Sequence, residues 1–238
     1  KVSSFDSAPN KDSRQVFVNQ AGTQAVGQAL MDAVLDISGG EGQFAILSAT
    51  SQSANQNAWI DAMKSIMEGD EKYSKLELVE VAYGDDEPQK STDQTAALLQ
   101  NYPDLKVICA PTTVGIAAAG EVLTQAKSDI KLTGLGLPSE MKNYMPATAD
   151  DDEFSFVCPY MMLWDVSHLG ASTAAIQMAV QNDGFDGSAG STVDMEAWGE
   201  YEAETFTAED NGDGGTGVLT GQPYVFYKDN MAEWVDKL

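Results

Sequence analysis

The sequence contains very little positive charge. Only 13 of its 238 residues are Lys or Arg, against 37 Asp and Glu, so its formal net charge is −24. A nucleic-acid interface needs a concentrated basic surface, so this balance argues against a nucleic-acid-binding protein. It equally argues against binding to an anionic membrane surface or a strongly anionic substrate. We interpret the acidic excess as a solvated surface that helps to keep the protein soluble.

The residues of common catalytic and metal sites are also scarce. There are two cysteines, Cys109 and Cys158, and a single histidine, His168. Two cysteines are too few for a disulfide scaffold or a structural zinc site. Each ends an apolar run, so we interpret both as buried thiols, with a disulfide between them as the open alternative. Because His168 has no recognisable nucleophile as a partner and no G-x-S-x-G motif is present, we expect no enzyme activity.

Long apolar runs and a leader segment are missing as well. No stretch approaches the roughly 18 consecutive apolar residues of a membrane-spanning helix. The first residues, KVSSFDSAPN, do not resemble a signal peptide and look like the end of a strand, so we expect that the natural chain begins earlier. Hydrophobic residues make up 43% of the chain, which is enough for a core, and the length predicts one large or two small domains.

Short apolar runs alternate with helical patterns along most of the chain. The runs from residue 44 to residue 157 are apolar throughout, as expected for parallel strands buried on both faces. Helical segments of about ten to fifteen residues separate them, which is typical of a doubly wound α/β fold. We therefore expect one parallel sheet over residues 15–158, with Leu76–Val81 toward an edge. The strands Phe44–Leu47 and Val107–Ala110 should be central in this sheet. The other predicted strands are Val16–Asn19, Leu76–Tyr83, Lys131–Leu135 and Phe154–Val157.

The last quarter of the chain departs from this rhythm. An apolar stripe predicts a long helix over Val166–Val180, and from Gly184 the sequence is acidic and rich in turn residues. A last strand is predicted at Tyr224–Tyr227, followed by a short helix. The segment EDNGDGG at 209–215 has the spacing of a calcium loop, but its twelfth position is Thr220 where a Glu is required. We interpret this segment as a polar turn and leave calcium binding open.

Polar side chains are concentrated where predicted strands end and helices begin. Ser48–Asn57 follows the strand Phe44–Leu47 and is rich in hydroxyl and amide groups, and Thr112 and Thr113 follow another strand. Ligands of open α/β sheets bind at these carboxyl ends of strands. Neutral groups that both donate and accept hydrogen bonds suit an uncharged polyhydroxylated ligand, whereas a phosphate would need Gly-rich loops and basic residues. The pattern predicts a binding site without cofactor or metal, since GLGLPS lacks the third glycine of a dinucleotide motif.

Several segments resemble one family. VNQAGTQAVGQAL, ILSATSQSANQNAWIDAMK, PDLKVICAPTTVGIAAA, TGLGLPSEMKNYM and GQPYVFYKDNMAEW are similar to the periplasmic sugar-binding proteins of ABC importers, which are type I solute-binding proteins. Within this family the chain most resembles the rhamnose-binding branch, which is related to the autoinducer-2 receptors. The resemblance runs from Val2 to Leu238 and implies two α/β lobes joined by hinge strands, with most of the first lobe absent from this chain.

The resemblance also implies a division of the chain. Residues 1–7 would end the first lobe and begin the hinge, and residues 8–158 would form the second, ligand-binding lobe. Residues 159–183 would contain a hinge crossing and a helix of the first lobe, and residues 184–238 the acidic segment with the final strand and helix. The helix over residues 166–180 would then lack its natural partner, so we expect self-association, or packing against another chain, through its apolar stripe.

Ligand contacts follow from the resemblance residue by residue. It assigns them to Asp6, Asn55, Gln56, Pro111, Thr113 and Pro159. Rhamnose-type proteins usually have Asn-Pro where this chain has Cys158–Pro159, which weakens the assignment there. Autoinducer-2 receptors have Asp and Ala at the positions of Asn55 and Thr113, and both differences favour a sugar.

The function implied is that of a solute-binding component that captures a rhamnose-like deoxy-sugar for an ABC permease in the membrane. Such a protein is periplasmic or extracellular, and we expect a membrane-tethered lipoprotein in the full-length form. An autoinducer-2 or another furanose or pentose stays open as the ligand. The rival of another class is the ligand-sensing lobe of a transcription regulator, which shares this architecture.

Overall fold

The computed structural model describes all residues, 1–238, as two units between which the chain crosses three times. Unit 1 comprises Lys1–Gly22 and Trp164–Gln222, and unit 2 comprises Thr23–Leu163 and Pro223–Leu238. The expected boundaries after residues 7 and 158 therefore differ from the observed ones. The reason at the first boundary is that β2 (Val16–Asn19) pairs with strands of unit 1, so the predicted single sheet over residues 15–158 is wrong at its start.

Unit 2 contains a four-stranded parallel sheet in the order β4-β3-β5-β6. Phe44–Leu47 and Val107–Ala110 are buried in its two central strands, which confirms the prediction from their apolar runs. The predicted edge position of the strand from Leu76 is confirmed too. The strands are β3 (Gly42–Ser48), β4 (Leu76–Tyr83), β5 (Leu105–Ala110) and β6 (Lys131–Gly134).

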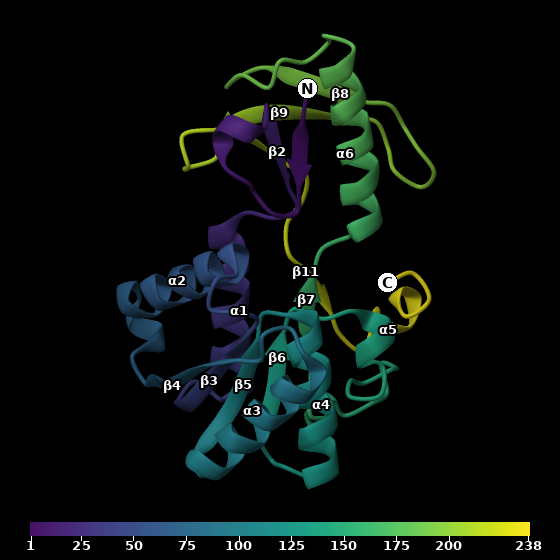
Figure 1. Ribbon diagram of the computed structural model, residues 1–238. Coiled ribbons are helices and arrows are strands. Elements are labelled where there is room, and N and C mark those ends of the chain that lie inside the picture. Colours follow the sequence, from purple (N-terminus) through teal and green to yellow (C-terminus); the bar gives the residue numbers. More distant parts are fainter. The chain divides into compact units, whose positions relative to one another are not determined.

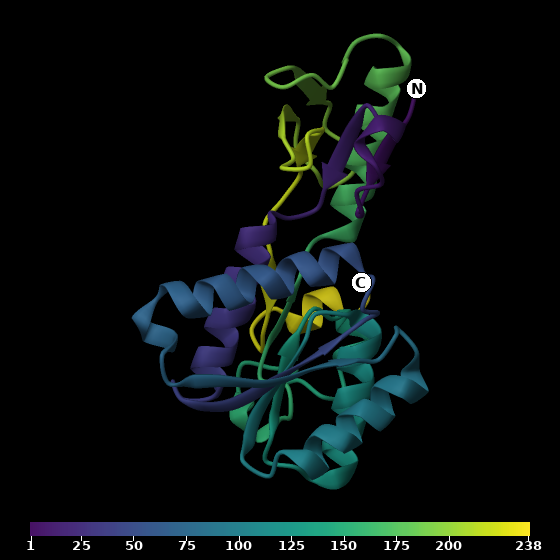
Figure 2. The same cartoon turned by 60° about the vertical axis from the view of Figure 1, so that its left-hand side comes forward.

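Helices cover both faces of this sheet, which confirms the doubly wound α/β fold (Figures 1 and 2). One pair packs together on one face and a second pair on the other. Gly27 allows the first pair to approach closely, because a Cβ at Gly27 would lie 2.7 Å from Cβ of Ala62. The first pair is α1 (Thr23–Ile37) and α2 (Ala54–Gly69), and the second is α3 (Pro88–Asn101) and α4 (Thr113–Ala126).

A short antiparallel pair completes unit 2. It joins β7 (Met161–Leu163) to β11 (Tyr224–Phe226), which confirms the predicted last strand. The predicted strand Phe154–Val157 is wrong, because the Asp152 carboxylate accepts a hydrogen bond from the backbone N–H of Phe154 and begins a 3-10 turn instead. The remaining short elements are η2 (Glu71–Tyr73), α5 (Pro138–Met141), η3 (Glu153–Ser155) and α7 (Met231–Trp234).

Unit 1 contains a five-stranded mixed sheet in the order β1-β2-β10-β9-β8. The first three strands are parallel, and the last two join antiparallel. Three of them, β8, β9 and β10, lie in the acidic segment after Gly184, where no strand was predicted. Exposed polar and buried residues alternate in β8 and β9, and β10 is only four residues long, so none of the three forms an apolar run. Besides β2 the strands are β1 (Ser3–Phe5), β8 (Thr192–Met195), β9 (Glu204–Asp210) and β10 (Thr216–Leu219), and η1 (Lys11–Ser13) precedes β2.

The helix α6 (Val166–Gln181) packs on β1, β2 and β8 of this sheet (Figure 1). Its residues Leu169, Ile176 and Val180 are buried, so the expectation that this apolar stripe lacks a partner is wrong. The sheet of unit 1 is that partner, and the reason given for self-association through the stripe no longer holds. No helix of the structure is long and apolar enough to span a membrane.

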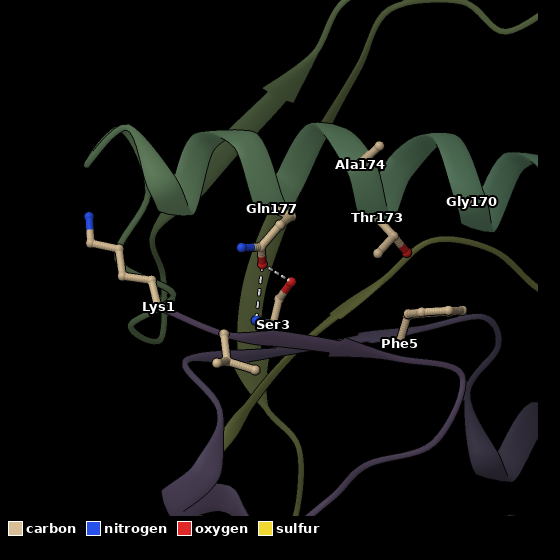
Figure 3. A pocket seen from close by; sticks show the side chains of 8 residues that line it. Lys1, Ser3, Phe5, Gly170, Thr173, Ala174 and Gln177 are labelled. Carbon is tan, nitrogen blue, oxygen red and sulfur yellow. Dashed lines mark hydrogen bonds between the residues drawn. The ribbon is translucent and has the colours of Figure 1, made fainter.

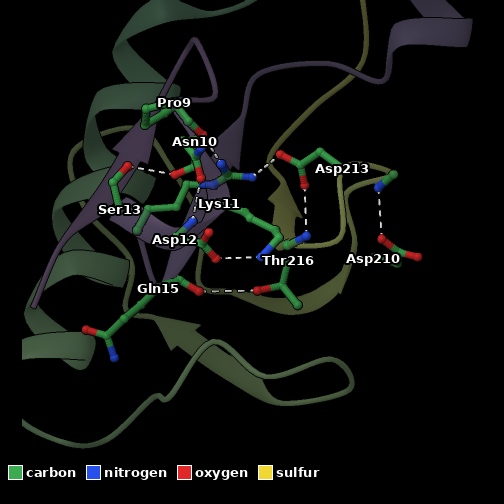
Figure 4. Close-up of polar contacts among 12 residues, drawn as sticks. Pro9, Asn10, Lys11, Asp12, Ser13, Gln15, Asp210, Asp213 and Thr216 are labelled. Carbon is green, nitrogen blue, oxygen red and sulfur yellow. Dashed lines mark hydrogen bonds and ion pairs between the residues drawn. The ribbon is translucent and has the colours of Figure 1, made fainter.

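The only arginine of the chain, Arg14, joins two loops of unit 1 through Pro9 and Asp213. Figure 4 shows Pro9 and Asp213, one from each loop. Arg14 has a side chain that is 1% exposed, and its Nη2 donates to Oδ2 of Asp213 at 2.6 Å. Its Nη1 donates to the carbonyl of Pro9. Asp213 also accepts from the backbone N–H of Gly215 at 2.9 Å. The turn at 209–215 is thus a polar turn bound to Arg14, and the structure contains no group of three or more His, Cys, Asp or Glu residues placed to hold a metal ion.

Candidate functional site

The loops that follow the parallel strands of unit 2 lie together at one edge of its sheet. The strands run in the same direction, so their carboxyl ends meet at this edge. Backbone hydrogen bonds join the first residue after one strand to the last residue of its neighbour, from Gly84 N–H to the Ser48 carbonyl at 2.9 Å and from Leu135 N–H to the Ala110 carbonyl at 3.0 Å. This edge is the candidate ligand-binding surface of the unit.

The loop after β3 uses part of its polar side chains to hold its own shape. The hydroxyls of Thr50 and Ser53 lie 2.9 Å apart, and Nδ2 of Asn57 donates to the carbonyl of Ser51 at 3.0 Å. The presence of these polar residues is therefore explained by the structure of a solvated loop, without a ligand. Asn55 and Gln56, half-buried, occupy the first turn of α2, at the carboxyl edge where the sequence placed them.

The loop after β5 brings Pro111 and Thr113 to the same edge. Pro111 is buried, and the partly exposed Thr113 begins α4. A Cβ at Gly115 would lie 2.7 Å from Cγ2 of Thr112, so only glycine fits the close packing of this helix start. The side-chain hydroxyl of Thr112 does not cap the helix and instead donates to Oδ1 of Asp86.

Asp86 is a residue of this edge that the sequence did not identify. It stands in GDDE, which resembles ordinary solvated loop charge, and no local pattern distinguishes it. Asp85 and Asp86 both have left-handed backbones, with φ of 54° and 53°. Two consecutive non-glycine residues in this conformation require support from their surroundings. The contacts of Asp86 with Thr112 and of Asp85 with Lys90 give that support.

The helix starts at this edge add backbone donors. Neither Ser53 before α2 nor Thr112 before α4 makes a side-chain capping hydrogen bond. The first N–H groups of a helix have no partner within the helix, so they can donate to a bound oxygen atom. With the amides of Asn55 and Gln56 and the hydroxyl of Thr113, the edge combines neutral donors and acceptors, which matches the hydrogen-bonding capacity of hydroxyl groups.

Two of the residues that the resemblance assigns to ligand contacts do not lie in the loops that follow the parallel strands of unit 2. Pro159 is buried in the segment that runs alongside β6, where the Thr133 hydroxyl donates to the Tyr160 carbonyl at 3.1 Å, rather than in a loop that follows a strand. Asp6 belongs to unit 1. It follows β1 with a left-handed φ of 62°, and its backbone N–H donates to the Val18 carbonyl at 3.2 Å. Desolvation raises the pKa of its carboxyl above the ordinary value.

The cysteines and the histidine have structural environments. Cys109 and Cys158 are free and buried, so the disulfide alternative is wrong. Burial raises the pKa of the Cys109 thiol to about 12 and raises that of Cys158 as well, so neither provides a thiolate near neutral pH. His168 lies on α6 with its Nε2 3.1 Å from Oε2 of Glu204 and its ring beside Tyr201. It therefore contacts a carboxylate and an aromatic ring rather than a nucleophile.

Comparison with known proteins agrees with this architecture. The model of the periplasmic binding protein domain family matches residues 1–184. An ABC transporter solute-binding protein from Clostridium phytofermentas, solved with bound L-rhamnose, is 49% identical over 100% of this chain and 73% of its own, with a TM-score of 0.91. A sugar ABC transporter from Actinomyces odontolyticus is 36% identical over 98% of this chain and 70% of its own, with a TM-score of 0.79.

A more distant structure shares the fold. The LsrB protein from Clostridium saccharobutylicum, solved in complex with AI-2, has a TM-score of 0.82 at 17% identity, over 98% of this chain and 74% of its own. The family match covers most of the chain, and two relatives exceed a third in identity over nearly all of it. The chain therefore belongs to the periplasmic binding protein family, as its sequence resemblance implied.

Proposed function

We propose that this protein is the solute-binding component of an ABC importer and that it binds a neutral deoxy-sugar of the rhamnose type. The observation that carries the proposal is the neutral hydrogen-bonding edge of unit 2, at Asn55, Gln56 and Thr113. It is supported by the 49% identical relative that was solved with L-rhamnose. Binding and release of the sugar would shift the protein between conformations rather than change the sugar chemically.

The two units fit this proposal as parts of two lobes. Unit 2, with its complete doubly wound sheet, would be the second lobe, and unit 1 would be the part of the first lobe that this chain provides. The L-rhamnose-bound relative has about a quarter of its length outside the match, which is room for the rest of such a lobe. In the full-length form we propose a periplasmic or extracellular location and a lipid anchor.

Calorimetric titration of the full-length protein with L-rhamnose tests the proposal. Loss of a hydrogen-bonding partner from a buried sugar hydroxyl costs roughly 1–3 kcal/mol, so Asn55→Ala and Gln56→Ala should each weaken binding about tenfold to a hundredfold. Asp6→Asn is measured beside them, because the resemblance assigns this carboxylate a ligand contact, and a similar loss is expected.

Two variants of the same loop serve as controls. Gln52 is exposed, and Asn57 holds the loop through Ser51. Gln52→Ala should leave the affinity unchanged, and Asn57→Ala separates loop shape from direct contact. Wild-type affinity in both the Asn55 and the Gln56 variant would contradict the site. Tight binding of AI-2 without L-rhamnose binding would favour the autoinducer alternative, and binding of neither would leave a regulator's sensing lobe as the better explanation.

A further inference from the structure

Two helix starts at the carboxyl edge of unit 2 differ from the start of α6 in unit 1. Before α6, the side chain of Asp165 caps the helix by accepting from the N–H groups of Ser167 and His168. Ser53 before α2 and Thr112 before α4 are also residues that commonly cap helices, yet neither side chain caps its helix. The chain thus has two suitable caps at the proposed binding edge and uses neither of them as a cap.

The hydroxyl of Thr112 is bonded to a neighbouring loop instead. It donates to Oδ1 of Asp86, and the part of Thr112 that lies closest to Gly115 is its methyl group, because a Cβ at Gly115 would lie 2.7 Å from Cγ2. A methyl group cannot accept a hydrogen bond from the helix. The hydroxyl of Ser53 is likewise engaged in its own loop, where its oxygen accepts from the N–H of Thr50 at 3.2 Å.

The first turn of α4 therefore keeps its backbone donors. The first hydrogen bond at this end of the helix runs from the N–H of Ile116 to the Thr112 carbonyl at 3.0 Å. The N–H groups of Thr113, Val114 and Gly115 come before this bond, so the helix contains no carbonyl to which they could donate. Thr113 is one of the residues of the proposed sugar site, so these donors belong to the same edge.

Asp86 is placed beside Thr112 by an unusual backbone. Asp85 and Asp86 have φ of 54° and 53°, in the left-handed region that few non-glycine residues adopt. Gly84 before them leaves no room for a side chain, because a Cβ there would lie 2.2 Å from Oγ of Ser91. Backbone strain of this kind is typical of functional sites, where the surroundings maintain it. Its result here is a carboxylate oxygen that accepts from the Thr112 hydroxyl.

We propose that Asp86 is a positioning residue of the sugar site. By binding the Thr112 hydroxyl, it keeps that side chain from capping α4 and leaves the N–H groups of Val114 and Gly115 free to donate to a sugar oxygen. The inference rests on the proposed sugar-binding function. Donors that are already open before the ligand arrives need no rearrangement on binding, which favours affinity. Asp86 thus acts on the sugar through Thr112.

Amide exchange measured by NMR on the full-length protein without sugar tests the first step. Asp86→Gly removes the carboxylate and keeps the backbone conformation, because glycine adopts a positive φ without strain. The Thr112 hydroxyl should then rotate to cap α4, so the N–H of Val114 or Gly115 should exchange more slowly than in the wild type. Asp86→Asn keeps an acceptor oxygen and tolerates the same φ, so it should exchange like the wild type.

Calorimetric titration with L-rhamnose tests the second step. Asp86→Gly should weaken binding about fivefold, the factor that corresponds to a typical cap that the sugar must displace. Thr112→Val has no hydroxyl that could cap, so Asp86→Gly should have no effect on affinity in a Thr112→Val background. A residue that merely supported the loop would not depend on that hydroxyl. Asp85→Gly is the matched control, since Asp85 has the same backbone conformation but pairs with Lys90, and its affinity should equal that of the wild type.

Gln177→Ala controls for a loss of stability away from the site. In unit 1 the side-chain oxygen of Gln177 accepts from the backbone N–H of Ser3 at 3.0 Å and from the Ser3 hydroxyl, and these bonds hold α6 to β1 (Figure 3). The variant should be less stable in urea, whereas the amide exchange of Val114 and Gly115 should stay at the wild-type rate.

The outcomes separate this inference from the proposed function. A wild type that does not bind L-rhamnose would contradict the proposed sugar. Unchanged amide exchange in Asp86→Gly would refute the positioning role whatever ligand binds. A loss of affinity in Asp86→Gly that persists in the Thr112→Val background would show that Asp86 contacts the sugar directly, which would also overturn the inference.

Discussion

At the scale of single residues, Arg14 has an environment that few arginines share. Its guanidinium is almost fully buried, binds Asp213 and the Pro9 carbonyl, and lies 5.8 Å from the ring centroid of Phe17. Its Nε makes no hydrogen bond. A buried cation depends strongly on its one charged partner, because removal of that partner leaves the charge uncompensated. Asp213 is 38% exposed, however, so solvent screens part of this effect.

Asp213→Asn should destabilise unit 1 by about 1–2 kcal/mol at pH 7, which urea denaturation will measure. Arg14 lowers the pKa of the Asp213 carboxyl. A lowered pKa in the folded state gives stability that is complete above the ordinary Asp value of about 4 and is lost as the pH falls through the lowered pKa. The difference between wild type and variant should therefore shrink below pH 4.

Asp210→Asn is the matched control for this experiment. Asp210 lies in the same turn and accepts only from the backbone N–H of Gly212, at 2.9 Å. Its replacement should cost less and should not remove the pH dependence. An Asp213→Asn variant as stable as the wild type at neutral pH would show that the pair contributes nothing measurable.

At the scale of helices and strands, the elements that could be predicted are those whose residues themselves indicate burial. Phe44–Leu47 and Val107–Ala110 are apolar throughout because helices cover both of their faces, so the central strands and their order could be predicted. β8 and β9 each have one solvated face with acidic exposed residues, so their sequences resemble those of polar turns. The partner sheet of β2 could not be predicted, because β2 pairs with β10 some 200 residues later.

The candidate site follows the same rule. Pro111 and Thr113 come just after a predicted strand, and Asn55 and Gln56 belong to the loop segment that follows another, so their place at the carboxyl edge could be derived from the order of the elements. Asp86 reaches Thr112 through two left-handed residues, a backbone feature that composition does not reveal. A local error at Phe154–Val157 likewise arose from a turn that Asp152 caps.

Gly134, the last residue of β6, provides a test at this scale. Its φ is 148°, and a Cβ there would lie 2.0 Å from the carbonyl oxygen of Ala110 on the neighbouring strand. The strand could accept that atom only by moving, so Gly134→Ala should destabilise unit 2 by about 3 kcal/mol or more in urea denaturation. Gly69→Ala, at the end of α2 with open space around it, should be nearly neutral. Equal effects of the two substitutions would contradict the steric argument.

At the scale of the whole molecule, the two units have separate cores. Unit 1 is organised around its mixed sheet and α6, and unit 2 around its parallel sheet with helices on both faces. Chains with more than one domain commonly depart from two-state unfolding, because each core can open independently of the other. Local substitutions should therefore act on one unit at a time.

Hydrogen exchange followed by mass spectrometry along a urea series will measure this independence. Asp213→Asn should lower the urea concentration at which peptides of unit 1 lose protection and leave those of unit 2 unchanged. Gly134→Ala should do the reverse. If both variants shift all peptides together, the chain unfolds as one cooperative body and the division has no thermodynamic meaning.

The pairing of β2 with β10 also determines how early in synthesis the sheet of unit 1 can be completed. The parallel sheet of unit 2 is complete in sequence once β6 has been synthesised, whereas β2 has β1 as an early partner but must wait for its second partner, β10, about 200 residues downstream. At about 5–20 residues per second, that wait is on the order of 10–40 s. Until β10 is made, Val16 and Val18, which have no exposed surface in the folded unit 1, lack the neighbouring strand on one side of β2.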